Sequence, residues 1–268
     1  MSEEIDDRST EVRTYFVRGR NALVARADFS KIFIDYYLHV ADCGLPLKPE
    51  EAEYAKSALA AVTLHGASRP RNERVAWTVN FQQPLLNVFA AGDNPLGTVV
   101  ANVFSEGVKV GTQNLFYADT IRDDAAARRS VVDFEGADFF AAAERYYAHS
   151  EQRAARFFLY GDDDYVLVSA QPDCDLDWLA NLNAAAVRNL DGAEQLALME
   201  QRFYRFECGC NQERMMRVLL PTFRLNPEAL YEGEEVVRMH CPRCGARHAI
   251  TRESLEAMEK AESAARTA

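Results

Sequence analysis

The sequence predicts an α+β protein: an N-terminal mixed α/β domain with antiparallel strands, a helical linker, and a small C-terminal domain built on four cysteines. Strand-like and helix-like periodicities alternate up to Pro172, and the strand signal disappears after it. Four of the six cysteines then fall in two short clusters near the C-terminus. We therefore divide the chain into an N-terminal domain (residues 1–172), a helical linker (173–206) and a C-terminal domain (207–268).

Composition sets the broad class. The chain has 268 residues, of which 48% are hydrophobic and 26% charged, as is ordinary for a soluble globular protein. The acidic start, MSEEIDDRST, resembles neither a secretory signal nor a transit peptide, and no run approaches the ~18 apolar residues of a membrane span. We expect a cytoplasmic protein whose thiols stay reduced, with no membrane partner. The net charge of −11 also argues against a nucleic-acid partner.

The elements of the first domain follow from its periodicities. Residues 1–10 are expected to form a flexible tail, and 12–28 a β-hairpin that turns at Arg18-Gly19-Arg20-Asn21. A helix is expected from Phe29 to Val40. A second helix runs from Pro49 to about Leu64, with proline in its first turn and Gly66 after its end.

The second half of this domain repeats both patterns. Residues 75–91 are strand-like, 91–97 form a dense turn, and 99–110 suggest another hairpin, interrupted at Glu106-Gly107. A helix is predicted over 137–152, where aromatic residues and alanine recur at helical spacing. Residues 156–170 then predict two strands around Gly161-Asp162-Asp163-Asp164.

The linker is expected to be helical. Its apolar residues follow helical spacing, Asp173 or Asp175 caps the start, and Gly192 ends the stretch. A second helical stretch, Ala193 to Arg202, leads to the first cysteine pair. The apolar stripe must be buried, because an exposed one would promote association; it comprises Leu176, Leu179, Leu182, Val187 and Leu190.

The C-terminal domain is expected to hold its cysteines on turns. Asn211 to Leu220 is predicted as a helix, and Pro221 to Leu230 as a helix or turn. Glu234–His240 and Ala246–Ile250 form a hairpin that bears Cys241 and Cys244. Thr251 or Ser254 then caps a terminal helix.

The clustered cysteines predict one zinc ion. Cys208-Gly209-Cys210 is followed by thirty residues without cysteine and then by Cys241-Pro242-Arg243-Cys244. Two thiols one or two residues apart can bind the same ion, and two such pairs complete a tetrahedral site. Four buried, reduced cysteines are the alternative, but the turn residues and charged neighbours of these clusters fit it poorly. His240 is a weaker candidate ligand, since the four thiols already fill a tetrahedron.

Other chemically capable residues are weaker candidates. His39 and Cys43 are one helical turn apart, but no third group orients a base, so a packed or solvated pair is favoured. Cys174 is expected to be an ordinary linker cysteine rather than an auxiliary thiol. Asp162-Asp163-Asp164 is read as a solvated turn rather than a cation site. The sequence therefore predicts no enzyme.

Energetics indicate what the metal controls. A structural zinc site supplies an apparent ~10–16 kcal/mol. A unit of about sixty residues with a thin core supplies no more than ~3–5 kcal/mol by itself. Each pair, Cys208 with Cys210 and Cys241 with Cys244, is also close enough in sequence to close as a disulfide. Oxidation would remove the ligands, expel the metal and unfold the unit, so the thiols are a plausible redox sensor.

The cysteine arrangement resembles that of the 33-kDa heat-shock family, the redox-regulated holdase chaperones. Asn211-Gln212-Glu213-Arg214 looks like the start of that family's helix after the first pair. Residues 92–97 (Gly-Asp-Asn-Pro-Leu-Gly) and 146–152 (Tyr-Tyr-Ala-His-Ser-Glu-Gln) are similar to segments of its N-terminal domain. The sequence departs from the family in three places. The connection from Pro172 to Cys208 is shorter than expected, Asn94 stands where glycine is usual, and residues 110–130 are divergent.

The resemblance implies a chaperone that is zinc-bound and inactive when reduced. Oxidation is then expected to join Cys208 to Cys210 and Cys241 to Cys244, to release zinc and to unfold the C-terminal domain. The loosened linker would uncover apolar surface that holds unfolding client proteins under oxidative stress, typically with formation of a homodimer.

Three other functions remain to be weighed. A constitutive protein-interaction module or chaperone with a purely structural zinc site is the main alternative. A thiol–disulfide oxidoreductase would require a CxxC that opens a helix, whereas this CxxC follows a strand. A zinc-ribbon nucleic-acid binder is disfavoured by the acidic charge.

Overall fold

The computed structural model describes residues 8–46 and 48–267. Most of the expected flexible tail, residues 1–7, lies outside the described residues, and Thr10 is already the first residue of strand β1 (Thr10–Arg18). Among the helices in these ranges, none is long and apolar enough to cross a membrane. The α+β class is confirmed.

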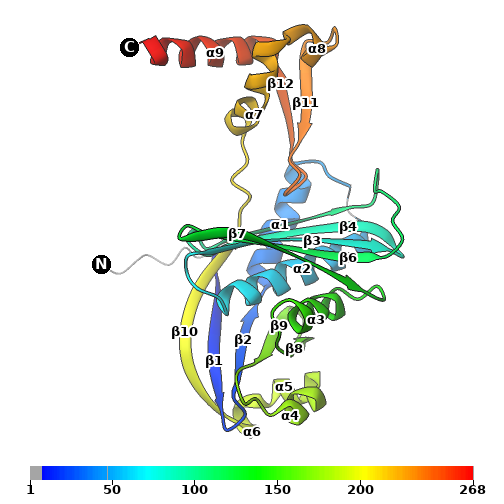
Figure 1. Ribbon diagram of the computed structural model, residues 1–268, viewed down its shortest axis with the longest axis vertical. Coiled ribbons are helices and arrows are strands. Elements are labelled where there is room, and N and C mark those ends of the chain that lie inside the picture. The colour runs from blue at the N-terminus through cyan, green and yellow to red at the C-terminus, as the bar shows by residue number, and fades with distance from the viewer. Residues whose placement is uncertain (1–7, 47, 268) are drawn as a thin grey trace.

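A ten-stranded sheet organises the N-terminal part, in the order β7-β6-β3-β4-β5-β10-β1-β2-β9-β8. Its two halves cross at a steep angle, and β10 joins them (Figure 1). One half contains β3 (Glu73–Gln82), β4 (Leu85–Asp93), β5 (Thr98–Phe104), β6 (Asn114–Arg122) and β7 (Ala125–Phe134). The other contains β1, β2 (Ala22–Asp28), β8 (Ala155–Leu159), β9 (Asp164–Ala170) and β10 (Gln195–Phe206).

Helix α2 (Pro49–Ala67) lies at the centre of the core, against β4 and β5 on one side and β2 and β9 on the other. It is rich in alanine, whose small side chain lets both halves of the sheet approach closely; Ala55, Ala58, Ala60 and Ala61 are fully buried. Helices α1 (Ser30–Asp42) and α3 (Phe139–His149) pack beside it. An aromatic cluster that includes Trp77, Phe116 and Tyr146 fills the space under β3 and β6.

Most of the predicted elements are confirmed. The β1–β2 hairpin turns at Gly19 and Asn21, both with positive φ. The three N-terminal helices and the β8–β9 pair are also found, within a few residues of the expected bounds. Helix α2 continues past Leu64, however, so that Gly66 lies inside it rather than after its end.

The hairpin predicted over 99–110 is wrong. Only Thr98–Phe104 is a strand, and the next strand, β6, begins at Asn114. Strand β5 pairs along its whole length with β4, but Glu106 and Gly107 form an exposed bend, so the chain leaves the sheet there.

Asn94, which stands where glycine is usual, does not adopt a positive φ. In this tight loop the positive φ belongs to Gly97. The Asn94 side chain instead joins three segments: Nδ2 donates to the carbonyl oxygens of Gly66 and Pro70, and Oδ1 accepts from the Tyr204 hydroxyl. A Cβ on Gly66 would lie 2.8 Å from Asn94 Oδ1, so this loop fits closely against α2.

The linker is helical only in its first part. Three short helices, α4 (Leu176–Asn181), α5 (Ala184–Arg188) and α6 (Leu190–Ala193), follow one another, and Asp175 rather than Asp173 caps the first. Gly192 lies inside α6 rather than beyond the last helix. The predicted apolar stripe is buried against β1, β2, β8 and β9, with the exception of Leu176, which is exposed; the buried members are Leu179, Leu182, Val187 and Leu190.

The helix predicted from Ala193 to Arg202 is wrong, because this stretch is most of strand β10. Its residues (QLALMEQR) are mainly good helix formers, which explains the prediction. Pairing with β1 from Gln195 to Tyr204 overrides that local preference. Residues 195–206 therefore belong to the sheet, whereas the division of the chain at 172 and 206 stays a prediction.

The C-terminal part is a separate small unit at one end of the molecule (Figure 1). It contains α7 (Gln212–Leu225), α8 (Pro227–Tyr231), the hairpin β11 (Val236–His240) and β12 (Arg247–Thr251), and α9 (Arg252–Thr267). The expected break at Pro221 is not found, and α7 continues to Leu225 because Leu220 and Phe223 on either side of the proline are both buried. The Thr251 side chain caps α9, as predicted.

Candidate metal centre

The first cysteine pair follows β10 directly. Arg205 and Phe206 pair in parallel with Thr98 and Val99 of β5, and Glu207 N–H donates to the Val99 carbonyl. Immediately after this, Gly209 adopts φ +65°, which turns the chain so that both cysteine side chains face the same side. Asn211 then caps α7 by accepting from Arg214 N–H at 2.8 Å. The pair is thus held between a sheet strand and a helix start.

The second pair lies in the loop that connects β11 and β12, as the sequence predicted. Residues Cys241–Ala246, which we call the knuckle, are closed by two backbone hydrogen bonds: Cys241 N–H to Ala246 O (2.8 Å) and Gly245 N–H to Cys241 O (2.9 Å). Gly245 has φ +76°, a conformation that favours glycine. The hairpin register, with His240 opposite Arg247, brings Cys241 and Cys244 to the same end.

The structure brings all four cysteines together. Their Sγ atoms all lie within 4.8 Å of one another, although the pairs are thirty residues apart in sequence. The shortest contacts run between the pairs, 3.6 Å from Cys208 to Cys241 and 3.5 Å from Cys210 to Cys244. Sulfurs placed ~2.3 Å from a central zinc ion would be about 3.8 Å apart, so the four thiols fit a tetrahedral ion with little adjustment.

Because the four thiols are buried close together, they change one another's pKa values. Cys241 and Cys244 are 2% exposed, and the other two are half-buried. Hydrogen bonds from Cys244 and Cys241, in that order, lower the pKa of Cys208 to about 5 despite its burial. The same interaction raises the pKa of Cys244, while burial raises that of Cys210 to about 12. The thiols thus stabilise one thiolate among themselves, and a cation that binds all four must displace the remaining protons.

His240 is not part of this cluster. It is exposed at the end of β11, and the metal-ligand group among the described residues contains only the four cysteines. The turn expected at Asp162–Asp164 joins β8 to β9, and Asp163 pairs with Lys56 of α2 at 2.8 Å, so it is bound to the core helix as well as in contact with solvent. Cys174 precedes α4 and packs on the linker cluster, away from the metal centre.

Sequence reasoning missed the role of His39 and Cys43. Both lie at the C-terminal end of α1 and contact the knuckle: the His39 Nε2 atom is 3.1 Å from the Cys244 carbonyl oxygen. Cys43 packs in the same apolar cluster as Cys241 and Cys244. No local signal predicts this, because about 200 residues separate α1 from the knuckle and only the folded chain brings them together.

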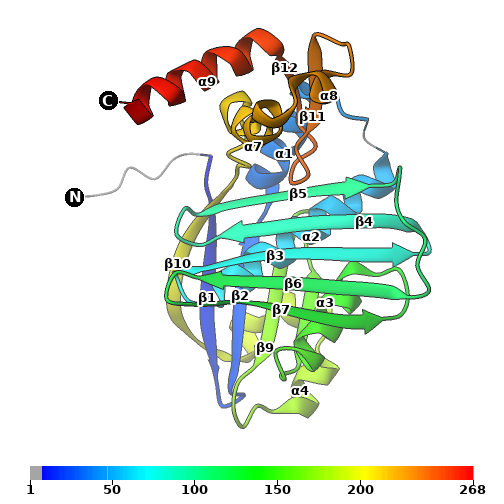
Figure 2. The same cartoon turned by 45° about the horizontal axis from the view of Figure 1, so that its top comes forward.

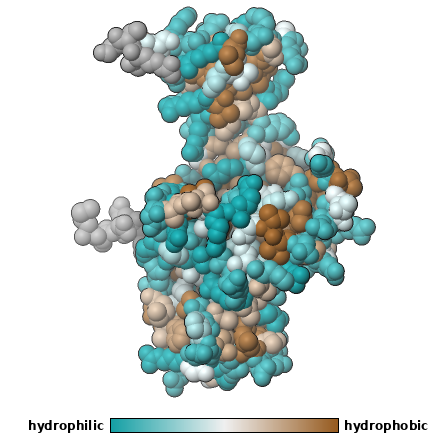
Figure 3. Space-filling view, viewed as in Figure 1, coloured by the Kyte–Doolittle hydropathy of each residue, from teal (hydrophilic) through white to brown (hydrophobic). Residues whose placement is uncertain are grey.

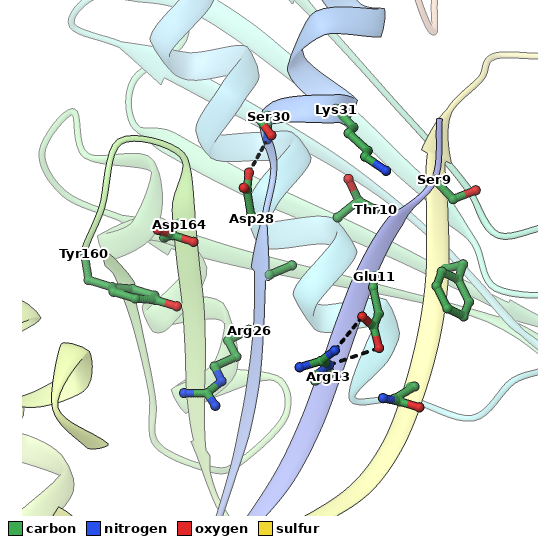
Figure 4. Close-up of a pocket in the computed structure, with 13 residues that line it drawn as sticks. Ser9, Thr10, Glu11, Arg13, Arg26, Asp28, Ser30, Lys31, Tyr160 and Asp164 are labelled. Atoms are coloured by element: carbon green, nitrogen blue, oxygen red, sulfur yellow. Dashed lines mark hydrogen bonds and ion pairs between the residues drawn. The ribbon is translucent and has the colours of Figure 1, made fainter. Parts of the chain in front are cut away.

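The other half of the sheet carries an open groove of about 700 Å³, lined by residues of β1, β2, β9 and β10 (Figure 4). Several of its charged side chains have hydrogen-bond partners. Glu11 accepts two hydrogen bonds from Arg13, and Asp28 accepts one from the Ser30 backbone. Arg26, at its edge, is bound by Asp191.

Comparisons with known proteins agree with the cysteine pattern. A family model described as Hsp33 protein matches residues 169–251, which include α4–α6, β10 and all four clustered cysteines. A 33 kDa chaperonin of Nitrosococcus oceani is 22% identical over 149 residues, or 48% of this chain and 52% of that protein. The match thus spans about half the length of this curated relative.

A solved structure extends the likeness to the whole fold. The crystal structure of a 33 kDa chaperonin (heat shock protein 33 homologue) from Thermotoga maritima matches with a TM-score of 0.71. The match covers 95% of this chain and 99% of that one at 15% identity, which shows a shared fold. The chain thus shares the fold of this 33 kDa chaperonin, and its segment 169–251, with all four clustered cysteines, matches the Hsp33 family model.

Proposed function

We propose that this protein is a redox-regulated holdase chaperone whose switch is a zinc ion held by Cys208, Cys210, Cys241 and Cys244. The observation that carries the proposal is the convergence of four thiols at tetrahedral spacing between two structural parts. The match of residues 169–251 to the Hsp33 family model and the likeness to a 33 kDa chaperonin support a chaperone function. Zinc is the metal that a site of four sulfurs favours in a reducing compartment, and when bound it supplies a cross-link between the two cysteine pairs.

The C-terminal unit depends on that cross-link. Its core is small, with six buried residues around α7 and the hairpin: Met215, Leu220, Phe223, Tyr231, Ile250 and Leu255. A core of this size supplies only ~3–5 kcal/mol, against an apparent ~10–16 kcal/mol from a structural zinc site. Without the metal, the first pair and the knuckle are joined only by weak thiol contacts, and the unit unfolds.

Oxidation removes the ligands. A peroxide takes two electrons from each pair: the two thiols become one disulfide, and the peroxide becomes two waters. Pairing of Cys208 with Cys210 and of Cys241 with Cys244 consumes two peroxides and leaves no thiolate to bind the ion. The protein then binds unfolded clients without chemical turnover, and the exposed surface favours a homodimer.

A specific observation favours the alternative, a constitutive chaperone or interaction module with a structural zinc site. The linker helices are buried on the sheet, and Arg20 holds both ends through Asp175 (2.7 Å) and Glu194 (3.0 Å). A linker fixed in this way resists the loosening that the switch requires.

Client aggregation distinguishes the two. The reduced, zinc-loaded protein and the peroxide-treated protein are each added to a thermally unfolding client, and light scattering is followed. We expect suppression by the oxidised form alone, reversed by a thiol reductant. Equal suppression by the reduced form would favour the constitutive chaperone, and zinc loss without suppression would leave only the structural role.

A further inference from the structure

Strands β1 and β2 form a hairpin that opens at the end away from its turn (Figures 1 and 2). Their pairing stops at Arg13 and Arg26, although β1 begins at Thr10 and β2 continues to Asp28. Beyond this point each strand keeps its other neighbour, since β1 pairs with β10 from Thr10 onward and β2 pairs with β9 as far as Asp28. The sheet is therefore split between two interior strands, and the groove of about 700 Å³ occupies the split (Figure 4).

The alternation of the main chain shows which groups face the split. In a strand, the N–H and C=O of one residue point to one side and those of the next residue to the other. Phe29 N–H donates to Asp163 O at 2.9 Å, on the side of β9, so the main chain of Asp28 faces β1. Val17 O accepts a hydrogen bond within the hairpin turn, so alternate residues of β1 down to Glu11 face β2. Glu11 and Asp28 would thus form the next hydrogen-bonded pair, and the split leaves them unpaired with each other.

The side chains beside the split repel one another. Asp28 and Asp164 lie directly opposite across β2 and β9, and Glu11 would lie opposite Asp28 on the same face if β1 stayed beside β2. Burial, followed by the charge of Asp28, raises the pKa of Asp164, although Arg188 opposes the shift. Like charges directly opposite one another destabilise strand pairing, which gives a physical reason for the separation of β1 from β2.

The wall of the groove formed by β2 and β9 is acidic. On the other wall, Glu11 is bound by Arg13 of its own strand at 2.8 Å. Asp28 and Asp164 stand opposite, and Lys31 lies at the end of the groove on α1 (Figure 4). A basic side chain placed between the walls would form charge-assisted hydrogen bonds with the two aspartates. Figure 3 shows hydrophilic side chains interspersed with apolar ones over the half of the molecule that contains β1 and β2, so charge and main-chain pairing are the features available for recognition.

A buried hydroxyl in the groove also lacks a partner. Thr10 is 2% exposed, and its Oγ1 atom has no hydrogen-bond partner among the described residues. The residue lines the groove, and Figure 4 shows its hydroxyl on the side of β1 that faces β2 and α1. Most buried polar atoms in folded proteins are hydrogen-bonded, because an unpartnered one costs free energy. A ligand in the groove would supply the missing partner.

We propose that the split is a binding site for an extended polypeptide segment that carries a lysine or arginine. The segment adds as a short strand between β1 and β2, and its main chain pairs with Glu11 on one side and with Asp28 on the other. The basic side chain lies beside Asp28 and Asp164, and the segment also binds the Thr10 hydroxyl. Two facing rows of main-chain groups define an extended occupant, and the two aspartates select its charge.

The site is distinct from the metal centre. The described residues that line the groove share no member with those packed around the four cysteines. Binding therefore does not require loss of the metal, and the inference goes beyond the proposed function. A failure of the oxidised protein to hold clients would leave it standing.

Synthetic peptides test the site on the full chain in its reduced, zinc-loaded form. The probe is a fluorescein-labelled peptide with one lysine at the centre of alternating valine and threonine. Two matched peptides carry either glutamate in place of the lysine or N-methyl groups on two central amides, which removes donors and keeps the side chains. Fluorescence anisotropy should show the lysine peptide binding about tenfold more tightly than either. Equal affinity for the glutamate peptide or for the methylated peptide would overturn the proposal.

Amide hydrogen exchange locates the bound peptide. The lysine peptide should slow exchange about tenfold at the Glu11 and Asp28 amides, because their N–H groups face the split. The amide of Gly107, in an exposed bend outside the groove, is the control and should exchange at the same rate with and without peptide. Binding that leaves both the Glu11 and the Asp28 amides unprotected would overturn strand insertion.

Two variants separate the charge from the hydroxyl. Asp28→Asn keeps an oxygen to accept from Ser30 N–H and removes the charge, so the affinity for the lysine peptide should fall about tenfold. Thr10→Val should weaken binding about fivefold without lowering the free energy of unfolding, because the hydroxyl has no partner in the free protein. Glu135→Gln, at an exposed carboxylate outside the groove, is the control and should match the wild type.

The outcomes of the variants are decisive in both directions. Wild-type affinity in a folded Asp28→Asn protein would show that the acidic wall does not select the peptide, and the proposal would fall. If Asp28→Asn does not fold, the comparison of the lysine, glutamate and methylated peptides on the wild-type protein decides in its place.

Discussion

At the scale of single residues, the metal centre is a set of thiols that cannot all be charged without a cation. Cys208 is the easiest to deprotonate because its neighbours donate to it, and the burial of Cys210 keeps that thiol protonated. A metal ion held by the four cysteines would replace these mutual hydrogen bonds with bonds to the sulfurs. Removal of one ligand therefore disables the whole site rather than a quarter of it.

Cys241→Ser tests this. The serine hydroxyl is a poor zinc ligand, so we expect zinc content to fall from one per chain to nearly none, with loss of most of the ~10–16 kcal/mol that the ion supplies to the C-terminal unit. Metal analysis and the helical circular dichroism signal measure the two effects. Cys174→Ser is the matched control, and a Cys241→Ser protein that keeps its full zinc content would contradict the ligand set.

His65 illustrates a different use of burial. It is 1% exposed inside α2 and hydrogen-bonded to the Tyr147 hydroxyl at 2.7 Å. Burial, together with Arg69, Arg153 and Arg128, lowers its pKa well below 6.5. The folded protein therefore holds this imidazole neutral at pH values where the unfolded chain takes up a proton.

The sign of the pH effect follows. Below pH 6.5 the unfolded state binds one more proton at His65 than the folded state. The free energy of unfolding therefore falls by up to about 1.4 kcal/mol for each unit by which the pH is lowered. Urea unfolding of the N-terminal part between pH 7 and pH 5 measures this slope. His65→Gln should reduce the slope by one proton; a wild-type slope in His65→Gln would refute the assignment.

The residues that the sequence identifies are those with a local signature. The sequence could predict that the two cysteine pairs share one site. Each pair needs only one glycine-containing turn to bring its two thiols to the same side. His39, Cys43 and Asn94 carry no such signature: each acts by touching chain that is distant in sequence, as when Asn94 binds Gly66 and Tyr204. The glycine expected at position 94 would indicate a requirement on the backbone conformation, whereas it is the Asn94 side chain that makes the contacts.

At the scale of elements, the segment from Asp173 to Phe206 shows where local propensity stops being informative. Its first half is helical, as the apolar stripe at helical spacing predicts, but it is divided into three short helices and leaves Leu176 exposed. Its second half, β10, consists of residues that suit a helix, and only pairing with β1 and β5 makes it a strand. Such pairing depends on partners almost 200 and 100 residues away, which no sequence window contains.

The packing of the linker gives a prediction for this element. Leu179 in α4 is 2% exposed against β8 and β9, whereas Leu176 in the same helix is 57% exposed. Leu179→Ala should cost about 2–5 kcal/mol locally and raise hydrogen exchange over residues 176–193. Leu176→Ala should change it little. An unchanged exchange pattern in Leu179→Ala would show that the linker is not held by its apolar face.

At the scale of the whole molecule, two parts with cores of unequal size meet at the four-cysteine cluster. The N-terminal sheet has a continuous core from β1 to β9 around α2, and the four clustered cysteines are not part of it. The C-terminal unit has a core of only six buried residues. The order of the ten strands could not be predicted, because β10 inserts between β5 and β1 from far along the chain.

Metal removal should therefore act on one part only. With a chelator at neutral pH, hydrogen exchange over residues 212–264 should lose its protection, while β3 and β4 keep theirs. Restoring zinc should restore the protection. Loss of protection throughout the chain would mean that the two parts fold as one, and the account of a separable switch would be wrong.

The most direct test of the central claim is a single peroxide titration of the reduced, zinc-loaded protein, in which a metallochromic dye reports zinc release and light scattering reports suppression of client aggregation. We predict that the two curves superimpose, reach one zinc per chain, and return together on addition of a reductant with zinc. Complete zinc release with no gain in suppression, or full suppression before any zinc is released, would contradict it.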